Sequence, residues 1–555
     1  MERTSIFFIF FGIALAIPVK DNLFELSVVH INDFHARFEE TTTSSGVCHD
    51  ASTCIGGFAR ITTQIEELLA AKPKSLLLNG GDNFQGTLYY TLFKWNITQE
   101  FLNKLPFDAI VLGNHEFDDG IPGVVPFIKS LKAPVICANI DDSDEPDIQN
   151  IYTKSVVVER DGKKIGIIGV LYAKTYEISS TGKLNFYPES ASVNEEAERL
   201  VREEGVFTNI VLSHVGYDID QIIAANASEK IGLIVGGHSH TFLYTGENPP
   251  GPDTPAGPYP TVVKSKNNKD VLIVQVSAYT KYVGNISVYY GDDGEVVTYD
   301  GSPIFIDNDI VQDEATTEAL GPWKEIVDLQ GSVQLGSTLV KLSKSGCYYR
   351  ECSLGNFVTD AYVYAYAQSA PAGAWTKAAI AFINAGGLRD SIEIGNITYS
   401  DVLTAQPFSN TVDFGQLQGK YIKEVLEQTT EQYQTQRVTS DLKLLQVSGI
   451  HVVYNLTRPQ GNRVQSVKVR CQKCDVPVYE NLDLEATYNI ITPSFVTGGG
   501  DGFYALSNNL KNVVIGQMDM DIFTKFLASR SPVFQEEEGR ITVISNNNVN
   551  YKAND

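Results

Sequence analysis

Residues able to bind metal ions follow five short apolar runs in the first half of the sequence. Each group stands where a buried strand should end and the chain should turn toward solvent. The groups offer aspartate, asparagine and histidine side chains and no cysteine. They are Asp33-Phe34-His35, Asn79-Gly80-Gly81-Asp82, Asn114-His115-Glu116-Phe117-Asp118, His214 and His238-Ser239-His240.

The histidine distribution favours one shared site. Of the eight histidines, five lie in these groups. A single histidine at a strand end is more often structural than a ligand, but the repetition points to a common role. Nitrogen and oxygen donors of this kind suit Zn, Mn or Fe. The set is too large for one tetrahedral ion. With a bridging carboxylate it fits two ions roughly 3.5–4 Å apart, the arrangement that clamps both oxygens of an in-line phosphoryl displacement.

The apolar runs themselves predict the elements that hold these residues. Amphipathic segments at Ile61–Lys72 and Val193–Glu204 have helical spacing, so the first half is predicted to be α/β. In open α/β sheets, ligands bind outside the carboxyl ends of the strands, and glycines let the backbone approach closely there. The predicted strands are Phe24–Ile31, Ser75–Leu78, Asp108–Leu112, Val135–Ala138, Ile165–Leu171, Asn209–Leu212 and Ile231–Val235.

The length of 555 residues exceeds what one core supports, so we expect two domains. We place the first at residues 22–311, a linker at 312–336 containing the helix Asp313–Leu329, and the second at 337–545. Gly246–Pro260 is rich in proline and glycine and is predicted to be a loop. In the second half we predict a strand at Ala378–Ile383, a helix at Ile422–Gln432, and a hairpin of Leu444–Val447 with Ile450–Tyr454.

The first residues are typical of a secretory signal, which we place at residues 1–16. Arg3 is followed by the apolar run Ile6–Ile13 and by Ala14-Leu15-Ala16, a small-x-small cleavage site. No later run is long enough to span a bilayer, and Asn546–Asp555 is polar, without the hydrophobic tail of a GPI signal. We therefore expect a secreted, extracellular protein without a membrane anchor.

Six of the seven cysteines form close pairs, which favours an oxidising compartment. A zinc ribbon at the last pair would need a second ligand pair, which the sequence lacks, so we predict local disulfides. They are Cys48/Cys54, Cys347/Cys352 and Cys471/Cys474, and Cys137 is left over. Glycosylation sequons stand at Asn96, Asn226, Asn285, Asn396 and Asn455.

The net charge of −24 argues against nucleic acid as a partner, because nucleic-acid binding needs a basic surface. An anionic phosphate substrate would need local cations. Two divalent ions, or a few placed arginines, would supply them.

The metal-ligand motifs carry a family resemblance. Asp33-x-His35, Gly81-Asp82, Gly113-Asn114-His115-Glu116, His214 and Gly237-His238-x-His240 resemble calcineurin-type metallophosphoesterases, and more closely the 5′-nucleotidase/apyrase family. The resemblance implies a layered α/β metallophosphoesterase domain joined by a helix to a smaller α/β nucleotide-binding domain. It implies that Asp33, His35 and His240 hold one divalent ion, that Asn114, His214 and His238 hold the other, and that Asp82 bridges them. The ions could be Zn, Mn, Ca or Mg. His115 with Asp118 resembles the catalytic dyad, and Glu116 is predicted to be a local structural acid.

The second half supplies the substrate motifs of the same family. They are Asn384-Ala385-Gly386-Gly387-Leu388-Arg389, Pro407-Phe408 and Phe495-x(5)-Asp501-Gly502. By resemblance Phe408 and Phe495 stack on the base, Asn384 touches it, Asp501 binds the ribose, and Arg389 binds phosphate. One position departs from the pattern: Tyr348 stands where related nucleotidases often have arginine after the first cysteine. Arg350, two residues on, is the candidate replacement.

The resemblance implies a secreted, metal-dependent nucleotide phosphohydrolase. We expect an apyrase that converts ATP and ADP to AMP and phosphate, similar to the salivary apyrases of blood-feeding arthropods, which remove the platelet agonist ADP. The alternatives are an AMP-specific 5′-nucleotidase, a phosphodiesterase on the same metal site, and a platelet- or integrin-binding protein that reuses the fold. Against the last, the ligand set is complete and no Arg-Gly-Asp is present.

Overall fold

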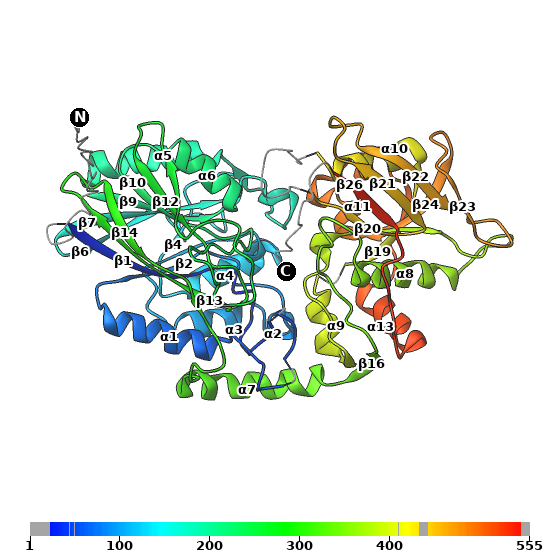
Figure 1. The fold of residues 1–555 in the computed structure, drawn as a ribbon, viewed down its shortest axis with the longest axis horizontal. Helices are drawn as coiled ribbons and strands as arrows, with labels where there is room; N and C mark the ends of the chain where they lie inside the picture. Colours follow the sequence, from blue (N-terminus) through cyan, green and yellow to red (C-terminus); the bar gives the residue numbers. More distant parts are fainter. Residues whose placement is uncertain (1–22, 44, 49, 409, 432–441, 546–555) are drawn as a thin grey trace, which may run out of the picture.

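The computed structural model describes residues 23–545 except 44, 49, 409 and 432–441. Two α/β halves lie side by side, and helix α7 (Glu314–Gly331) runs below the N-terminal half in this view and leads into the C-terminal half (Figure 1). The fold class expected from the sequence is confirmed. The predicted signal peptide, residues 1–16, lies outside the described residues. Within the described part, no helix is long and apolar enough to cross a membrane.

The N-terminal half is built on two sheets. The first has the order β14-β13-β1-β2-β3-β4, with β15 paired to β13, and the second has the order β11-β12-β10-β9-β7-β6. Strands β1 to β4 run parallel, as do β7, β9, β10 and β12. The first sheet contains β1 (Phe24–Ile31), β2 (Leu76–Asn79), β3 (Ala109–Val111), β4 (Val135–Ile136), β13 (Tyr282–Tyr290), β14 (Val296–Gly301) and β15 (Ile304–Phe305). The second contains β6 (Ser155–Arg160), β7 (Lys163–Leu171), β9 (Thr208–His214), β10 (Ile231–Val235), β11 (Thr261–Lys264) and β12 (Asp270–Val274).

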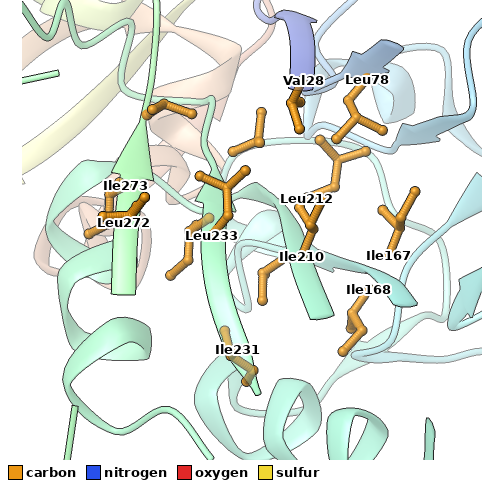
Figure 2. Packing of buried hydrophobic residues seen from close by; sticks show 14 of the residues in the cluster. Val28, Leu78, Ile167, Ile168, Ile210, Leu212, Ile231, Leu233, Leu272 and Ile273 are labelled. Atoms are coloured by element: carbon orange, nitrogen blue, oxygen red, sulfur yellow. The ribbon is translucent and has the colours of Figure 1, made fainter. Parts of the chain in front are cut away.

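The inner faces of the two sheets form one apolar core. Figure 2 shows side chains from both sheets meeting: Val28 and Leu78 from the first, and Ile167, Leu212 and Leu233 from the second. These side chains are fully buried. Each of their strands contains a run of aliphatic residues that is buried on both faces, which accounts for the apolar runs in the sequence.

Helices cover the outer faces of both sheets. Val29, the neighbour of Val28 in β1, points to the opposite face and joins a second cluster with Phe58 and Phe101. That cluster packs α1 (Phe58–Ala71), α3 (Trp95–Leu102) and part of α4 (Gly120–Ser130) on the first sheet. Helices α5 (Glu189–Arg199) and α6 (Tyr217–Ala225) pack on the second sheet. The result is a four-layer α-β-β-α sandwich.

The C-terminal half contains a five-stranded sheet, β20-β17-β24-β19-β25, and a four-stranded sheet, β23-β22-β21-β26. Helices α8 (Ser353–Ala367) and α13 (Asp519–Arg530) pack against each other beside the first sheet, and α10 (Gly419–Gln428) lies in the cluster between the sheets. The strands are β17 (Ile380–Asn384), β19 (Val412–Gln418), β20 (Leu445–Ser448), β21 (Ile450–Asn455), β22 (Val464–Arg470), β23 (Tyr479–Asn481), β24 (Thr487–Pro493), β25 (Lys511–Val514) and β26 (Ile541–Ile544).

Two expectations about local structure have different outcomes. The connecting helix begins where predicted, since Asp313 is its N-cap and accepts a hydrogen bond from Thr316 N at 2.7 Å. The predicted hairpin is wrong, because β20 pairs with β17 whereas β21 pairs with β22 and β26. Gly449, at a φ of 71°, turns the chain from one sheet into the other. A Cβ there would collide with Ala379 O, so the turn requires glycine.

The predicted cysteine pairs are all bonded, with Cα separations of 5.8 Å for Cys48–Cys54, 5.1 Å for Cys347–Cys352 and 6.0 Å for Cys471–Cys474. Cys137 is free and buried. Of the sequon asparagines, Asn96, Asn226 and Asn396 are exposed, while Asn285 and Asn455 are half-buried.

Candidate metal centre and nucleotide cleft

The predicted metal ligands all come from the carboxyl ends of five parallel strands. Asp33 and His35 follow β1, Asp82 follows β2, and Asn114 follows β3. His214 is the last residue of β9, and His238 and His240 follow β10. The two sheets bring their strand ends together at this edge, so residues far apart in the sequence become neighbours.

The backbone around these ligands is unusually tight. Asp33, His35, Asp82, His238 and His240 all have a positive φ, between 49° and 76°, which is costly for residues other than glycine. Gly113 is required beside them, since a Cβ there would collide with the Asp82 carboxylate. Such strain concentrated at one spot is typical of a functional site.

One group of converging ligand atoms consists of Asp33, His35 and His240. The Nε2 atoms of His35 and His240 lie 3.0 Å apart, and His240 Nε2 lies 3.4 Å from Asp33 Oδ1. The Nδ1 atom of His35 lies 3.1 Å from Phe84 O, an acceptor, so this nitrogen carries the proton and Nε2 presents its lone pair.

A second group consists of Asp82, His214 and His238. Asp82 Oδ2 lies 3.1 Å from His214 Nε2 and 3.7 Å from His35 Nε2, so one carboxylate faces both groups. Asn114 joins the second group, with its Oδ1 2.7 Å from His238 Nδ1. The structure therefore brings all seven predicted ligands together, with Asp82 between the two groups.

The electrostatics of the centre favour cations. Burial lowers the pKa of His238 to about 3, so its imidazole is neutral and able to coordinate. Burial also acts against protonation of His214, but the Asp82 carboxylate outweighs it and raises the pKa to about 10. Burial acts against ionisation of Asp82, yet His214 and His115 hold the pKa of its carboxyl well below the usual range.

The donor set fits two divalent ions. His214 Nδ1 lies 2.6 Å from Gly80 O and donates to it, while its buried Nε2 faces Asp82 Oδ2 at 3.1 Å without an aligned hydrogen bond. Histidines that bind metal ions typically donate a hydrogen bond from one ring nitrogen, which fixes the ring, and present the other nitrogen to the ion. The ring of His214 is held in this way. In the first group, the Nε2 atoms of His35 and His240 face each other, which likewise fits a position between them for an ion.

The predicted dyad is present at the edge of the centre. His115 Nδ1 lies 2.7 Å from Asp118 Oδ2, and Ser179 donates a hydrogen bond to Asp118 Oδ1 at 2.8 Å. Burial lowers the pKa of His115, but the Asp118 and Asp82 carboxylates outweigh it and raise the pKa above the ordinary value. The backbone N–H of His115 donates to Asp82 Oδ1 at 2.9 Å, which ties the dyad to the centre.

Glu116 has the structural role predicted for it. Its buried carboxylate accepts hydrogen bonds from four backbone amides: Gly113 N at 2.5 Å, Asn83 N at 2.6 Å, Asp82 N at 3.0 Å and Phe84 N at 3.3 Å. It therefore ties the loop after β2 to the loop after β3.

The predicted nucleotide residues face this centre from the C-terminal half. Phe408 stacks on His115, with ring centroids 5.9 Å apart and an interplanar angle of 25°. The guanidinium of Arg389 also lies over the Phe408 ring, with its Cζ 5.7 Å from the ring centroid. Asn384 Nδ2 donates to Asp501 Oδ2 at 2.8 Å, so the two predicted polar contacts form one unit.

A cleft of about 810 Å³ joins the two sets of residues. Its walls include Asp82, Asn114, His115, His238 and His240 from one half, and Asn384, Arg389, Phe408, Phe495 and Asp501 from the other. This volume suits a small organic ligand.

The cleft also corrects and extends the sequence interpretation. Arg350 does not replace the missing arginine, because it pairs with Glu537 at 2.7 Å on the surface and is absent from the cleft wall, whereas Tyr348 lines it. Sequence reasoning missed Tyr279, Lys344 and Ser179. None stands in a motif, since each reaches the cleft only through the tertiary fold.

Two known families match the chain. The Calcineurin-like phosphoesterase family matches residues 26–242, and the 5'-nucleotidase C-terminal domain matches residues 333–508. The apyrase of Tabanus yao is 46% identical over 95% of this chain and 96% of its own length. The chain belongs to the 5′-nucleotidase/apyrase family.

Other members of the family agree with this assignment. The human 5'-nucleotidase is 35% identical over 93% of this chain and 90% of its own length. The crystal structure of a 5'-nucleotidase precursor from Thermus thermophilus has a TM-score of 0.85 and 34% identity, and it covers 94% of this chain and 100% of its own. The chain is therefore a phosphoester hydrolase, and its first domain carries a dinuclear site for divalent ions.

Proposed function

We propose that this protein is an apyrase, which hydrolyses ATP and ADP to AMP and phosphate. One observation supports it most: a single cleft joins the candidate metal centre to the aromatic and polar residues suited to a nucleotide. The 46% identity to an apyrase supports ATP and ADP as substrates.

We assign one ion to Asp33, His35 and His240, and the other to Asn114, His214 and His238, with Asp82 shared. Two divalent ions here would activate water as a nucleophile and offset the negative charge of the phosphoryl group. Zn, Mn, Ca and Mg are the candidates that the family resemblance implies: the imidazole donors suit Zn, and the carboxylate and amide oxygens suit Mn, Ca and Mg.

In this proposal His115 is placed to donate to the transferring phosphoryl group through Nε2. Asp118 fixes the imidazole by accepting from Nδ1, and Ser179 fixes Asp118 in turn. The oriented imidazolium would stabilise the negative charge that develops on the phosphoryl group.

The nucleoside part is assigned to the C-terminal half. Phe408 and Phe495 would stack on the base, because aromatic faces bind any base and both rings line the cleft. Asn384 would contact the base and Asp501 the ribose hydroxyls, while Arg389 would bind phosphate.

We also propose the domain bounds: residues 22–311 for the first domain, 312–336 for the linker and 337–545 for the second domain.

We further propose that the protein is secreted and that its removal of ADP suppresses platelet aggregation. The three disulfides support an oxidising compartment.

An AMP-specific 5′-nucleotidase and a binding protein without activity are the competing functions.

A substrate panel tests the proposal. Phosphate release from ATP, ADP, AMP and a phosphodiester should be measured with and without a chelator, and again after each divalent ion is restored. We expect release from ATP and ADP that the chelator abolishes. Release from AMP alone would establish a 5′-nucleotidase, and no release from any substrate would favour a binding protein. ADP-induced platelet aggregation with the active protein and with an inactive variant would separate hydrolysis from receptor binding.

A further inference from the structure

Two cations line the cleft wall beside each other, and only one of them belongs to a recognised motif. Arg389 ends the Asn384–Arg389 segment, whereas Lys344 lies in the loop before the Cys347–Cys352 disulfide. Lys344 Nζ donates a hydrogen bond to Arg389 O at 3.2 Å. Both side chains are half-buried and line the cleft.

The backbone holds Lys344 in this place. Leu342 and Ile392 exchange two backbone hydrogen bonds, with Leu342 N to Ile392 O at 2.9 Å and Ile392 N to Leu342 O at 3.0 Å. Lys344 N donates to Ser391 Oγ at 3.0 Å. The loop of Lys344 and the loop of Arg389 are thus joined side by side, so the two cations are positioned before any ligand arrives.

The ammonium group of Lys344 is available for an anion. Among the described residues, no carboxylate forms an ion pair with it; the neighbouring Asp390 pairs with Arg37 at 3.1 Å. In an acidic protein of net charge −24, a cation held in a cleft without a carboxylate partner points to an anionic ligand.

The two cations have different surroundings. The guanidinium of Arg389 lies over the ring of Phe408, with its Cζ 5.7 Å from the ring centroid, and that ring stacks on His115 of the dyad. The ammonium group of Lys344 instead binds the main-chain oxygen of Arg389, at 3.2 Å. Lys344 is therefore displaced from the position where a terminal phosphate would meet the metal ligands.

We propose that Lys344 is a specificity-determining residue that binds a non-terminal phosphate of a nucleoside di- or triphosphate. The inference rests on the proposed function, because it takes the terminal phosphate to lie at the metal centre and the base to lie between Phe408 and Phe495. A diphosphate or triphosphate then presents a further anionic group between these points, beside Arg389 and Lys344. A monophosphate has no such group, so Lys344 favours ADP and ATP over AMP.

Lys344→Gln tests this by a comparison of substrates. We expect the KM for ADP and ATP to rise about tenfold, the effect of losing one charge-assisted hydrogen bond, while the KM of AMP, or its Ki if it is not hydrolysed, changes less than about twofold. Lys344→Arg should restore most of the affinity, since it keeps the cation. Lys341→Gln is the matched control, because Lys341 is in the same loop but pairs with Glu393 at 2.8 Å outside the cleft.

A second readout measures how anions inhibit the hydrolysis of a small aryl phosphate. This reaction needs only the metal centre, because the substrate has no nucleoside and no second phosphate. In Lys344→Gln the Ki of pyrophosphate should rise about tenfold, while the Ki of inorganic phosphate stays constant. Equal changes for ADP and AMP, or no change for either, would overturn the assignment even if the wild type is an apyrase. If the wild type releases no phosphate from ADP or ATP, the proposed function fails, and the role of Lys344 fails with it.

Discussion

At the scale of single residues, His115 connects three parts of the site. Its ring nitrogen Nδ1 forms a hydrogen bond with Asp118, the face of its ring stacks on Phe408, and its backbone N–H donates to Asp82. The ring contacts and the backbone contact can be separated by mutation, because alanine keeps the N–H. This distinguishes a residue that acts on substrate from one that holds a metal.

His115→Ala should lower kcat for ADP by about 10²–10⁴-fold, the usual contribution of a positioned proton donor, with both metal ions retained. Asp82→Asn should instead lose metal, because it removes the carboxylate shared by the two ligand groups. Steady-state kinetics and metal analysis by mass spectrometry give the two readouts. Wild-type turnover in His115→Ala would show that the dyad assignment is wrong.

The aromatic pair gives a second prediction at this scale. Phe408→Ala with Phe495→Ala should raise the KM for nucleotides at least about tenfold, since stacking contributes about 1–3 kcal/mol per base. Hydrolysis of a small aryl phosphate should be spared. Phe495→Ala alone is the cleaner variant, because Phe408 also contacts His115. Equal losses on both substrates would refute base stacking.

At the scale of elements, the site depends on loops that Glu116 ties together. The carboxylate of Glu116 accepts from amides in the loop after β2 and the loop after β3, including the amide of Asp82 itself. Two strand ends are thereby fixed relative to one another without any contact to substrate. The tie explains why Asp82 keeps a positive φ of 53°.

Glu116→Gln should weaken metal binding about 10–100-fold and lower the melting temperature, because an amide NH₂ would face backbone N–H donors. Metal titration and thermal unfolding measure the two effects. Asp119→Asn is the control: within the described part of the chain, its carboxylate binds Tyr90 at 2.6 Å and Lys94 at 3.0 Å, and no amide of the loops after β2 and β3. Similar metal affinity in both variants would contradict the role of Glu116.

The elements also show how far the sequence could lead. The bounds of β1 and β10 match the predicted strands, because apolar runs between turn residues define such strands well. The convergence of the predicted metal ligands at one edge could be predicted, since each of them follows one of these runs. The pairing of β20 and β21 could not, because the turn at Ser448-Gly449 is compatible with a hairpin and with a change of sheet. Lys344 and Ser179 were missed because only tertiary contacts bring them to the site.

At the scale of the whole molecule, a buried ion pair connects the two halves. Arg37 Nη2 lies 3.1 Å from Asp390 Oδ2, and both side chains are 2% exposed. Arg37 is held further by His35 O at 3.1 Å, Gly86 O at 2.5 Å and the ring of Tyr279 at 4.6 Å. The loops of the predicted metal ligand His35 and of Arg389 are therefore joined directly, which keeps the candidate metal centre facing the predicted nucleotide residues.

Asp390→Asn should destabilise this arrangement by about 3–5 kcal/mol, because it leaves the buried Arg37 without its counter-charge. We expect a raised KM for ADP with unchanged metal content, and a larger radius of gyration by small-angle scattering if the halves separate. Arg350→Gln is the matched control: its pair with Glu537 lies within the C-terminal half, with both side chains 47% exposed. Exposed pairs of this kind contribute about 0–1 kcal/mol, so unfolding should hardly change. Equal destabilisation by the two variants would show that the buried Arg37–Asp390 pair contributes no more to the free energy of unfolding than an exposed pair does.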